Sequence, residues 1–202
     1  MDYLMDLGGS IPFDVDPDKG KIDYRQVARH ECGHAVVAIA KHKRIEYIRL
    51  GRSVVKETHA ETKHEPTDDP RVECLIASAG VVAERRYSTT VLENAGKRDR
   101  ENMEWWVARY PAAFPWHEDT EGWWDTFVDA LEREADALLA QHSALFGTLV
   151  ARLDELIIEW DWKPSPFGLW RSDVEAIIEQ IAPARGSTPG VKVAGPDGPP
   201  AA

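Results

Sequence analysis

The spacing of apolar positions predicts that most of this chain is helical. Apolar side chains recur every three or four residues in several segments, and this is the period of an amphipathic helix. The segments cover residues 23–43, 70–87, 97–110, 121–160 and 173–181. Residues 121–160 are long enough for two helices, or for one helix that bends near Gly147.

One short region has the pattern of a small β-sheet instead. Residues 45–50 alternate between apolar and polar side chains, as a strand with one buried face does. Residues 53–59 could form a second strand, and a polar loop is expected to follow as far as residue 65. The expected fold class is therefore mainly α, of the α+β type, with a small β-sheet near residues 45–59.

The two ends of the chain lack these periodic patterns. Residues 1–20 contain scattered Gly and Pro and predict a flexible N-terminal arm. Residues 183–202 are rich in Pro and Gly and contain no aromatic residue, which predicts a disordered C-terminal tail. A single domain is expected between them, at residues 21–182.

Composition narrows the classes of function. The 202 residues carry a net charge of -11, which argues against a nucleic-acid partner because phosphate binding needs a basic surface. The longest apolar runs, residues 35–40 and 75–83, are too short to span a bilayer, so no membrane segment is expected. The start of the chain lacks the features of a secretory signal, and Cys32 and Cys74 suit buried thiols. A cytoplasmic protein is expected.

The strongest chemical signal is a His-Glu-x-x-His motif in the first predicted helix. His30 and His34 are four residues apart, so both imidazoles lie on one helix face and can reach one metal ion, usually zinc. Glu31 is placed to take a proton from a water that the ion activates. Such short motifs also occur by chance in amphipathic helices.

The residues around the motif favour a real metal site. The helix is largely apolar, so its two His and its Glu would be buried and would need partners. Asp23 and Gln26 have the spacing of a capping box that opens the helix. Gly33 lies in the middle of the helix, where Gly costs about 1 kcal/mol relative to Ala. Close approach of another backbone would explain it.

Other polar residues are candidates for a third ligand. Asp99 is the first residue on a helix face that also includes Met103, Trp106, Val107 and Tyr110, so its carboxylate is expected to face the core. Asp99 could instead be the N-cap of that helix.

Three further side chains have a simpler interpretation. Glu84 lies at the edge of the apolar face of the helix at residues 70–87, where a solvated carboxylate is the simplest interpretation. His59 and His64 could bind metal, but they are better explained as solvated residues of the polar loop.

Three segments together resemble a known family. Residues 30–38 read His-Glu-Cys-Gly-His-Ala-Val-Val-Ala, residues 79–84 read Ala-Gly-Val-Val-Ala-Glu, and residues 96–99 lead into a helix. They resemble, in turn, the His-Glu-Ala-Gly-His-Ala helix, the Ala-Gly-Arg-x-Ala-Glu helix and the third-ligand segment of the FtsH-type zinc peptidases. Val81 replaces the Arg of the second motif. The similarity covers about residues 23–182.

The resemblance implies a zincin-like helical peptidase domain with zinc bound by His30, His34 and Asp99. It implies that Glu31 is the general base. Glu84 would be a carboxylate that supports a ligand or, as the weaker alternative, would replace Asp99 as the third ligand. The strand at residues 45–50 would hold an extended substrate by edge pairing.

These observations lead to an expected function and two alternatives. The expected function is a zinc metalloendopeptidase acting on peptides or unfolded protein segments. The alternatives are a non-catalytic, zinc-stabilised adaptor that binds extended peptides, and a zinc peptidase of another lineage with a different third ligand. The family usually adds a membrane anchor and an ATPase domain, and no phosphate-binding Gly-x-x-x-x-Gly-Lys-Ser/Thr occurs here. A homo-oligomer, or an ATPase partner on a separate chain, would fit.

Overall fold

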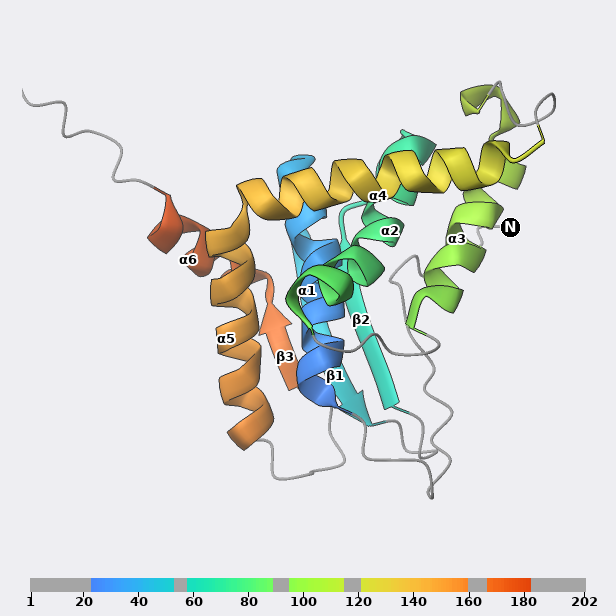
Figure 1. Cartoon of the computed structure of the whole chain (residues 1–202). Helices are drawn as coiled ribbons and strands as arrows, with labels where there is room; N and C mark the ends of the chain where they lie inside the picture. The colour runs from blue at the N-terminus through green and yellow to red at the C-terminus, as the bar shows by residue number, and fades with distance from the viewer. Residues whose placement is uncertain (1–22, 53–57, 89–94, 115–120, 160–166, 183–202) are drawn as a thin grey trace, which may run out of the picture.

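The fold is mainly helical with one small sheet, as the sequence predicts (Figure 1). The computed structural model describes residues 23–52, 58–88, 95–114, 121–159 and 167–182. In chain order, the elements of these residues are α1 (Tyr24–Ala40), β1 (Ile45–Arg52), β2 (Thr58–His64), α2 (Pro70–Tyr87), α3 (Ala95–Arg109), the 3-10 helix η1 (Pro111–Ala113), α4 (Trp123–Gln141), α5 (Ser143–Glu159), β3 (Phe167–Trp170) and α6 (Arg171–Ile181). The expected N-terminal arm and C-terminal tail lie outside the described residues.

The sheet has three antiparallel strands in the order β2-β1-β3. Ile48 of β1 pairs with Thr62 of β2 on one side and with Leu169 of β3 on the other. The expectation that β1 receives a substrate by edge pairing is therefore wrong, because both edges of β1 are already occupied. The described part of the second strand, Thr58–His64, includes most of the segment expected to be a loop, and residues 53–57 of the predicted strand lie outside the described residues.

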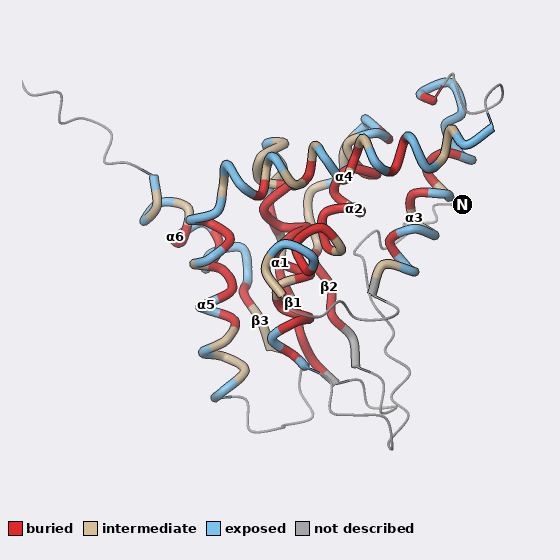
Figure 2. Tube along the Cα trace, viewed as in Figure 1, coloured by how far each residue is buried: buried red, intermediate tan, exposed pale blue. Residues whose placement is uncertain are grey.

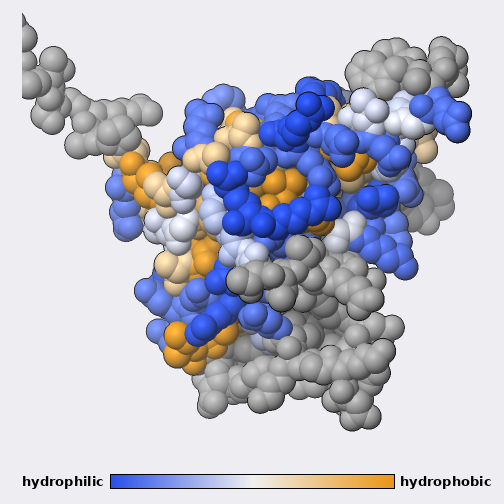
Figure 3. All heavy atoms as spheres, in the orientation of Figure 1, coloured by the Kyte–Doolittle hydropathy of each residue, from blue (hydrophilic) through white to orange (hydrophobic). Residues whose placement is uncertain are grey.

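Helix α1 lies at the centre of the molecule, in front of the sheet in Figure 1 and against α2 and α5. Helix α4 crosses the C-terminal end of α1, and its outer side is mainly hydrophilic (Figure 3). Buried residues are concentrated along α1 and the strands behind it (Figure 2). Among the described residues, none of the helices combines the length and apolar character needed to cross a membrane.

Two glycine contacts explain how closely α1 and α2 pack. A Cβ on Gly33 of α1 would lie 2.5 Å from the carbonyl oxygen of Ala79 and 2.6 Å from Cβ of Ala83, both on α2. The prediction that Gly33 permits close approach of another backbone is confirmed. This contact sets α2 directly beside the His-Glu-x-x-His face of α1.

The helix ends match the predicted ones to within a few residues. The Asp23 carboxylate accepts the backbone N–H groups of Arg25 and Gln26, so it caps α1 as expected. The Gln26 side-chain nitrogen also donates to Glu84 at 3.2 Å, which links the first turn of α1 to α2. The long helical region 121–160 is two helices separated at His142, and no bend occurs at Gly147.

Candidate metal centre

Helices α1 and α3 bring together the three residues expected to bind metal. The Nε2 atoms of His30 and His34 are 3.0 Å apart. The Asp99 carboxylate lies 3.0 Å from His30 Nε2 through Oδ2 and 3.6 Å from His34 Nε2 through Oδ1. All three side chains are buried, and one ligand atom from each lies within 4.8 Å of the others.

Hydrogen bonds on the far side of each ring fix which nitrogen faces the cluster. His34 Nδ1 lies 2.7 Å from the Ile76 carbonyl oxygen, which can only accept, so Nδ1 carries the proton. His30 Nδ1 donates in the same way to the Glu84 carboxylate at 2.6 Å. In their neutral forms, both imidazoles therefore present unprotonated Nε2 atoms to each other and to Asp99.

With both imidazoles neutral, the three inward-facing groups are all acceptors, and this arrangement could hold a cation. Among the described residues, neither Asp99 oxygen has a hydrogen-bond donor, although both are buried. Buried acceptors that face one another without a proton or a metal ion repel and leave their desolvation cost uncompensated. Two imidazole nitrogens and one carboxylate, with the outer ring nitrogens held by hydrogen bonds, form a donor set that suits zinc.

The pKa values show how strongly the site attracts positive charge. Burial lowers the pKa of His30, but the negative charge of Asp99, together with the hydrogen bond to Glu84, outweighs it and raises that pKa to about 10. Burial lowers the pKa of His34 to about 4, against the opposing effect of Asp99. Without a metal ion, a proton on His30 would supply the positive charge at the site. The imidazole of His34 stays neutral, as a metal ligand must be.

A glycine on α2 leaves the space in front of the two imidazoles open. A Cβ on Gly80 would lie 2.6 Å from His34 Nε2 and closer still to the ring of His30. Any other residue at this position would fill the space into which both Nε2 atoms point. In the sequence, Gly80 belongs to the apolar face of the helix at residues 70–87, where it predicts close packing against another helix, but that pattern does not reveal its place in front of the two imidazoles.

Glu31 is fully buried beside the three ligands, and neither of its carboxylate oxygens has a hydrogen-bond partner among the described residues. Burial raises its pKa to about 8, although the neighbouring His30 acts in the opposite direction. The backbone of Glu31 is held by the Thr62 hydroxyl of β2, which donates to its carbonyl oxygen at 2.9 Å. A buried carboxyl group with a pKa near neutrality can both accept and return a proton.

The interpretation of Glu84 as a solvated carboxylate is wrong. Its side chain is fully buried, with Oε1 on His30 and Oε2 at 3.2 Å from the Gln26 amide nitrogen. Glu84 lies on the opposite side of the His30 ring from the cluster of Nε2 atoms, so the geometry favours Asp99 as the third ligand. The sequence does not predict the partnership of Gln26 with Glu84, because the two are 58 residues apart and no local pattern connects them.

The structure also shows where the remaining candidate residues lie, as far as they belong to its described part. Asp99 is the fifth residue of α3, so it is not an N-cap. Tyr110 follows the end of α3 and is exposed, unlike the rest of the predicted stripe. The His64 side chain is only 6% exposed and faces Glu73, so it is not a solvated loop residue. The side chain of His59 lies outside the described part of the structure.

Comparison of the chain with protein-family models and with curated proteins finds no match. The similarity to FtsH-type peptidases therefore rests on the three segments at residues 30–38, 79–84 and 96–99.

Proposed function

We propose that this chain is a zinc metalloendopeptidase of the FtsH type that cleaves peptides or unfolded protein segments. The observation that carries the proposal is the convergence of His30 Nε2, His34 Nε2 and the Asp99 carboxylate, all buried and all acceptors. A zinc ion held by these three residues would supply Lewis acidity, which lowers the pKa of a water molecule to about 7 and polarises a peptide carbonyl.

Glu31 is the residue proposed to move the proton. Its carboxylate accepts a proton from the attacking water and returns it to the leaving amine nitrogen. Within the described structure both of its buried oxygens lack a hydrogen-bond partner, which supports this role because a carboxylate kept only for structure is normally paired. His30, His34 and Asp99 stay in place during these transfers, with Glu84 holding the His30 ring.

The substrate is proposed to bind as an extended strand along β2. Within the described residues, β2 pairs only with β1, so its second edge is open to another strand. The hydrogen bond from the Thr62 hydroxyl to the Glu31 carbonyl oxygen joins this strand to α1, which supports the proposal. Backbone pairing at such an edge binds peptides largely independently of sequence.

The two alternatives make different demands on these residues. An adaptor stabilised by zinc needs the three ligands but has no use for a buried, unpaired carboxylate beside them. A zinc peptidase of another lineage would use a third ligand other than Asp99. The geometry of Glu31 and Asp99 favours the FtsH-type proposal over both.

The proposal extends to the surroundings in which the enzyme works. The buried, unbridged thiols of Cys32 and Cys74 suit the reducing cytoplasm. The substrate is a peptide or an unfolded protein, and no nucleic acid is expected to bind. A homo-oligomer is compatible with this function, and folded substrates would need a separate ATPase chain to unfold them.

The test compares wild type with Glu31→Gln by elemental analysis and by casein cleavage. Both proteins are expected to hold about one zinc, because no ligand is altered, and elemental analysis also distinguishes zinc from iron, which accepts similar ligands. The variant is expected to cleave about 10² to 10⁴ times more slowly, since Gln cannot accept the proton. Equal cleavage rates would remove Glu31 as the base. If both proteins hold zinc and neither of them cleaves casein, the result would favour the zinc-stabilised adaptor.

A further inference from the structure

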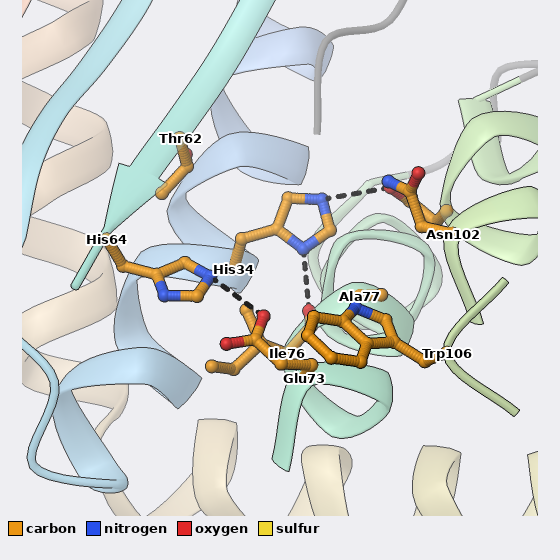
Figure 4. A pocket seen from close by; sticks show the side chains of 9 residues that line it. His34, Thr62, His64, Glu73, Ile76, Ala77, Asn102 and Trp106 are labelled. Atoms are coloured by element: carbon orange, nitrogen blue, oxygen red, sulfur yellow. Dashed lines mark hydrogen bonds and ion pairs between the residues drawn. The ribbon is translucent and has the colours of Figure 1, made fainter. Parts of the chain in front are cut away.

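A small cavity beside the metal centre lies between strand β2 and helix α3. Thr62 and His64 of β2 line one side of it, Asn102 and Trp106 of α3 line the other, and His34 lies between them (Figure 4). Its volume of about 20 Å³ is room for one water molecule or one carbonyl oxygen, and not for a long side chain. A substrate can therefore reach into it only with a single small group, such as a group of its backbone.

Helix α3 places the side chain of Asn102 in the wall of this cavity. Asn102 follows the proposed ligand Asp99 by three residues, so the two side chains lie on one face of the helix. Asn102 is half-buried, and its carboxamide points towards the His34 imidazole (Figure 4). Among the described residues, its side chain has no hydrogen-bond partner. A carboxamide that is partly withdrawn from water is stabilised by a ligand that uses its donor and its acceptor.

Other polar side chains in the wall of the cavity already have partners. The Thr62 hydroxyl donates to the Glu31 carbonyl oxygen at 2.9 Å. His64 and Glu73 face each other, and each makes a further hydrogen bond with the backbone. Among the lining residues in the described structure, the carboxamide of Asn102 alone combines a donor and an acceptor that no other group uses.

The position of Asn102 suits the outer edge of a bound strand. Helix α3 lies on the side of β2 that faces away from β1 (Figure 1). A substrate strand paired with the open edge of β2 would therefore lie between β2 and α3. In an extended strand, the N–H and C=O groups of one residue point to one side and those of the next residue point to the other.

A carboxamide matches the backbone groups that such a strand presents to α3. When one substrate residue pairs with β2, the next residue directs its N–H and C=O groups away from β2. The Oδ1 atom of Asn102 can accept from that N–H, and its Nδ2 atom can donate to that C=O. One side chain can thus satisfy both backbone groups of one substrate residue.

We propose that Asn102 binds the backbone of one substrate residue on the side opposite β2, with Oδ1 accepting the N–H and Nδ2 donating to the C=O of that residue. This inference rests on the proposed peptidase function and adds a substrate-binding residue to that site. The substrate strand is held along both of its edges, and neither contact depends on its side chains. Such binding suits unfolded substrates of mixed sequence.

The test measures binding and couples Asn102 to one backbone group of the peptide. A fluorescein-labelled casein peptide is titrated with the zinc-loaded Glu31→Gln protein and followed by anisotropy. A series of the same peptide carries an ester oxygen in place of each backbone N–H in turn. Adding Asn102→Ala should weaken binding of the parent peptide about tenfold, because two hydrogen bonds are lost.

The ester series identifies the backbone group that Asn102 contacts. Adding Asn102→Ala should reduce the loss of affinity caused by the ester about fivefold at one position, because the hydrogen bond to that N–H is already absent. The losses at the two neighbouring positions, which pair with β2, should stay the same. Equal ester effects with and without Asn102 at every position would overturn the proposal.

Matched variants separate this contact from a general effect on the site. Glu104→Ala, which removes an exposed side chain of α3, should change neither the affinity nor the ester effects. Asn102→Leu keeps much of the side-chain volume without its hydrogen bonds, so it should reproduce the effect of Asn102→Ala. Elemental analysis should find about one zinc in all of these proteins. Loss of zinc from Asn102→Ala would overturn the assignment of Asn102 to the substrate.

The outcomes for Asn102 and for the peptidase are separable. Coupling between Asn102 and one ester, with no cleavage of any peptide by wild type, keeps the contact and rejects the peptidase. Cleavage by wild type with no coupling at any position keeps the peptidase and rejects the contact. If no peptide binds and none is cleaved, both are rejected.

Discussion

Glu84 accepts a hydrogen bond from His30 Nδ1 at 2.6 Å, although the two residues are 54 positions apart and on different helices. The contact fixes the orientation of the imidazole and the position of its proton, and it increases the basicity of the opposite nitrogen. Gln26 in turn holds the second oxygen of Glu84. The ring of His30 is therefore oriented before any metal ion arrives.

Replacing Glu84 by Gln should weaken zinc binding by about 10- to 100-fold, which is the usual loss when the partner of a ligand His is removed. Competition with a chromogenic chelator measures the affinity. Glu104→Gln, which changes an exposed carboxylate on α3, should leave the affinity unchanged. An unaltered affinity in Glu84→Gln would show that the charge of Glu84 does not support the site.

Replacing Gly80 by Ala should prevent zinc binding, because the new Cβ would lie 2.6 Å from His34 Nε2 and even closer to the His30 ring. Elemental analysis of the purified variant checks this. Gly147→Ala is the matched control, since a Cβ at this position of α5 would have no described atom within 4 Å. That control should keep its zinc and gain up to about 1 kcal/mol in stability from the higher helix propensity of Ala. A Gly80→Ala protein with a full zinc content would contradict the geometry.

Replacing Asp99 by Ala should abolish both zinc binding and peptidase activity. The carboxylate is the only acidic ligand in the proposed set, and the remaining two His form an incomplete site. Glu101→Ala, which changes an exposed residue slightly further along α3, should retain both properties. Loss of zinc from Glu84→Ala together with retention by Asp99→Ala would instead make Glu84 the ligand.

The metal-free protein should lose stability as the pH rises above about 6.5. Burial lowers the pKa of His30, but Asp99 and Glu84 raise it to about 10, so the folded chain keeps a proton that the unfolded chain releases. The free energy of unfolding therefore falls between pH 6.5 and about 10. Glu31, whose pKa is raised by burial to about 8, acts in the same direction between pH 4.5 and 8. His34, whose pKa burial lowers to about 4, reduces stability as the pH falls below 6.5.

Thermal unfolding in EDTA across this range measures the effect. With saturating zinc the decline should be smaller, because the metal replaces the proton on His30 and binds more tightly as protons leave. His30→Gln should flatten the decline in the metal-free protein. A metal-free midpoint temperature that increases steadily with pH across this range would contradict the prediction.

The parts of the fold that the sequence predicts are those with a strong local period. The predicted bounds of helix α2 are the observed ones, since Pro70 and the apolar face of the helix mark it clearly. Strand β3 is not predicted because four residues are too few to show a period. Strand β2 continues past its predicted end at residue 59, because its polar residues pair with β1 and are buried by tertiary contacts, which a local pattern does not reveal.

The same distinction holds at the metal centre. His30 and His34 are one helical turn apart, so their convergence follows from the sequence. Asp99 is selected by its place in an apolar stripe, and the structure brings it to the two His. The contacts of Glu84 with Gln26 and of His64 with Glu73 depend on how separate elements dock, and no spacing along the chain encodes them.

The central position of α1 also determines which parts of the protein can unfold locally. Residues from Val27 to Ala38 are almost wholly shielded by α2, α5 and the sheet, so their amides should exchange with solvent deuterium only on global unfolding. Fraying of outer elements such as α6 would leave both imidazoles where they are. A metal ion would therefore leave by stepwise ligand dissociation while the helix that carries the two His stays folded.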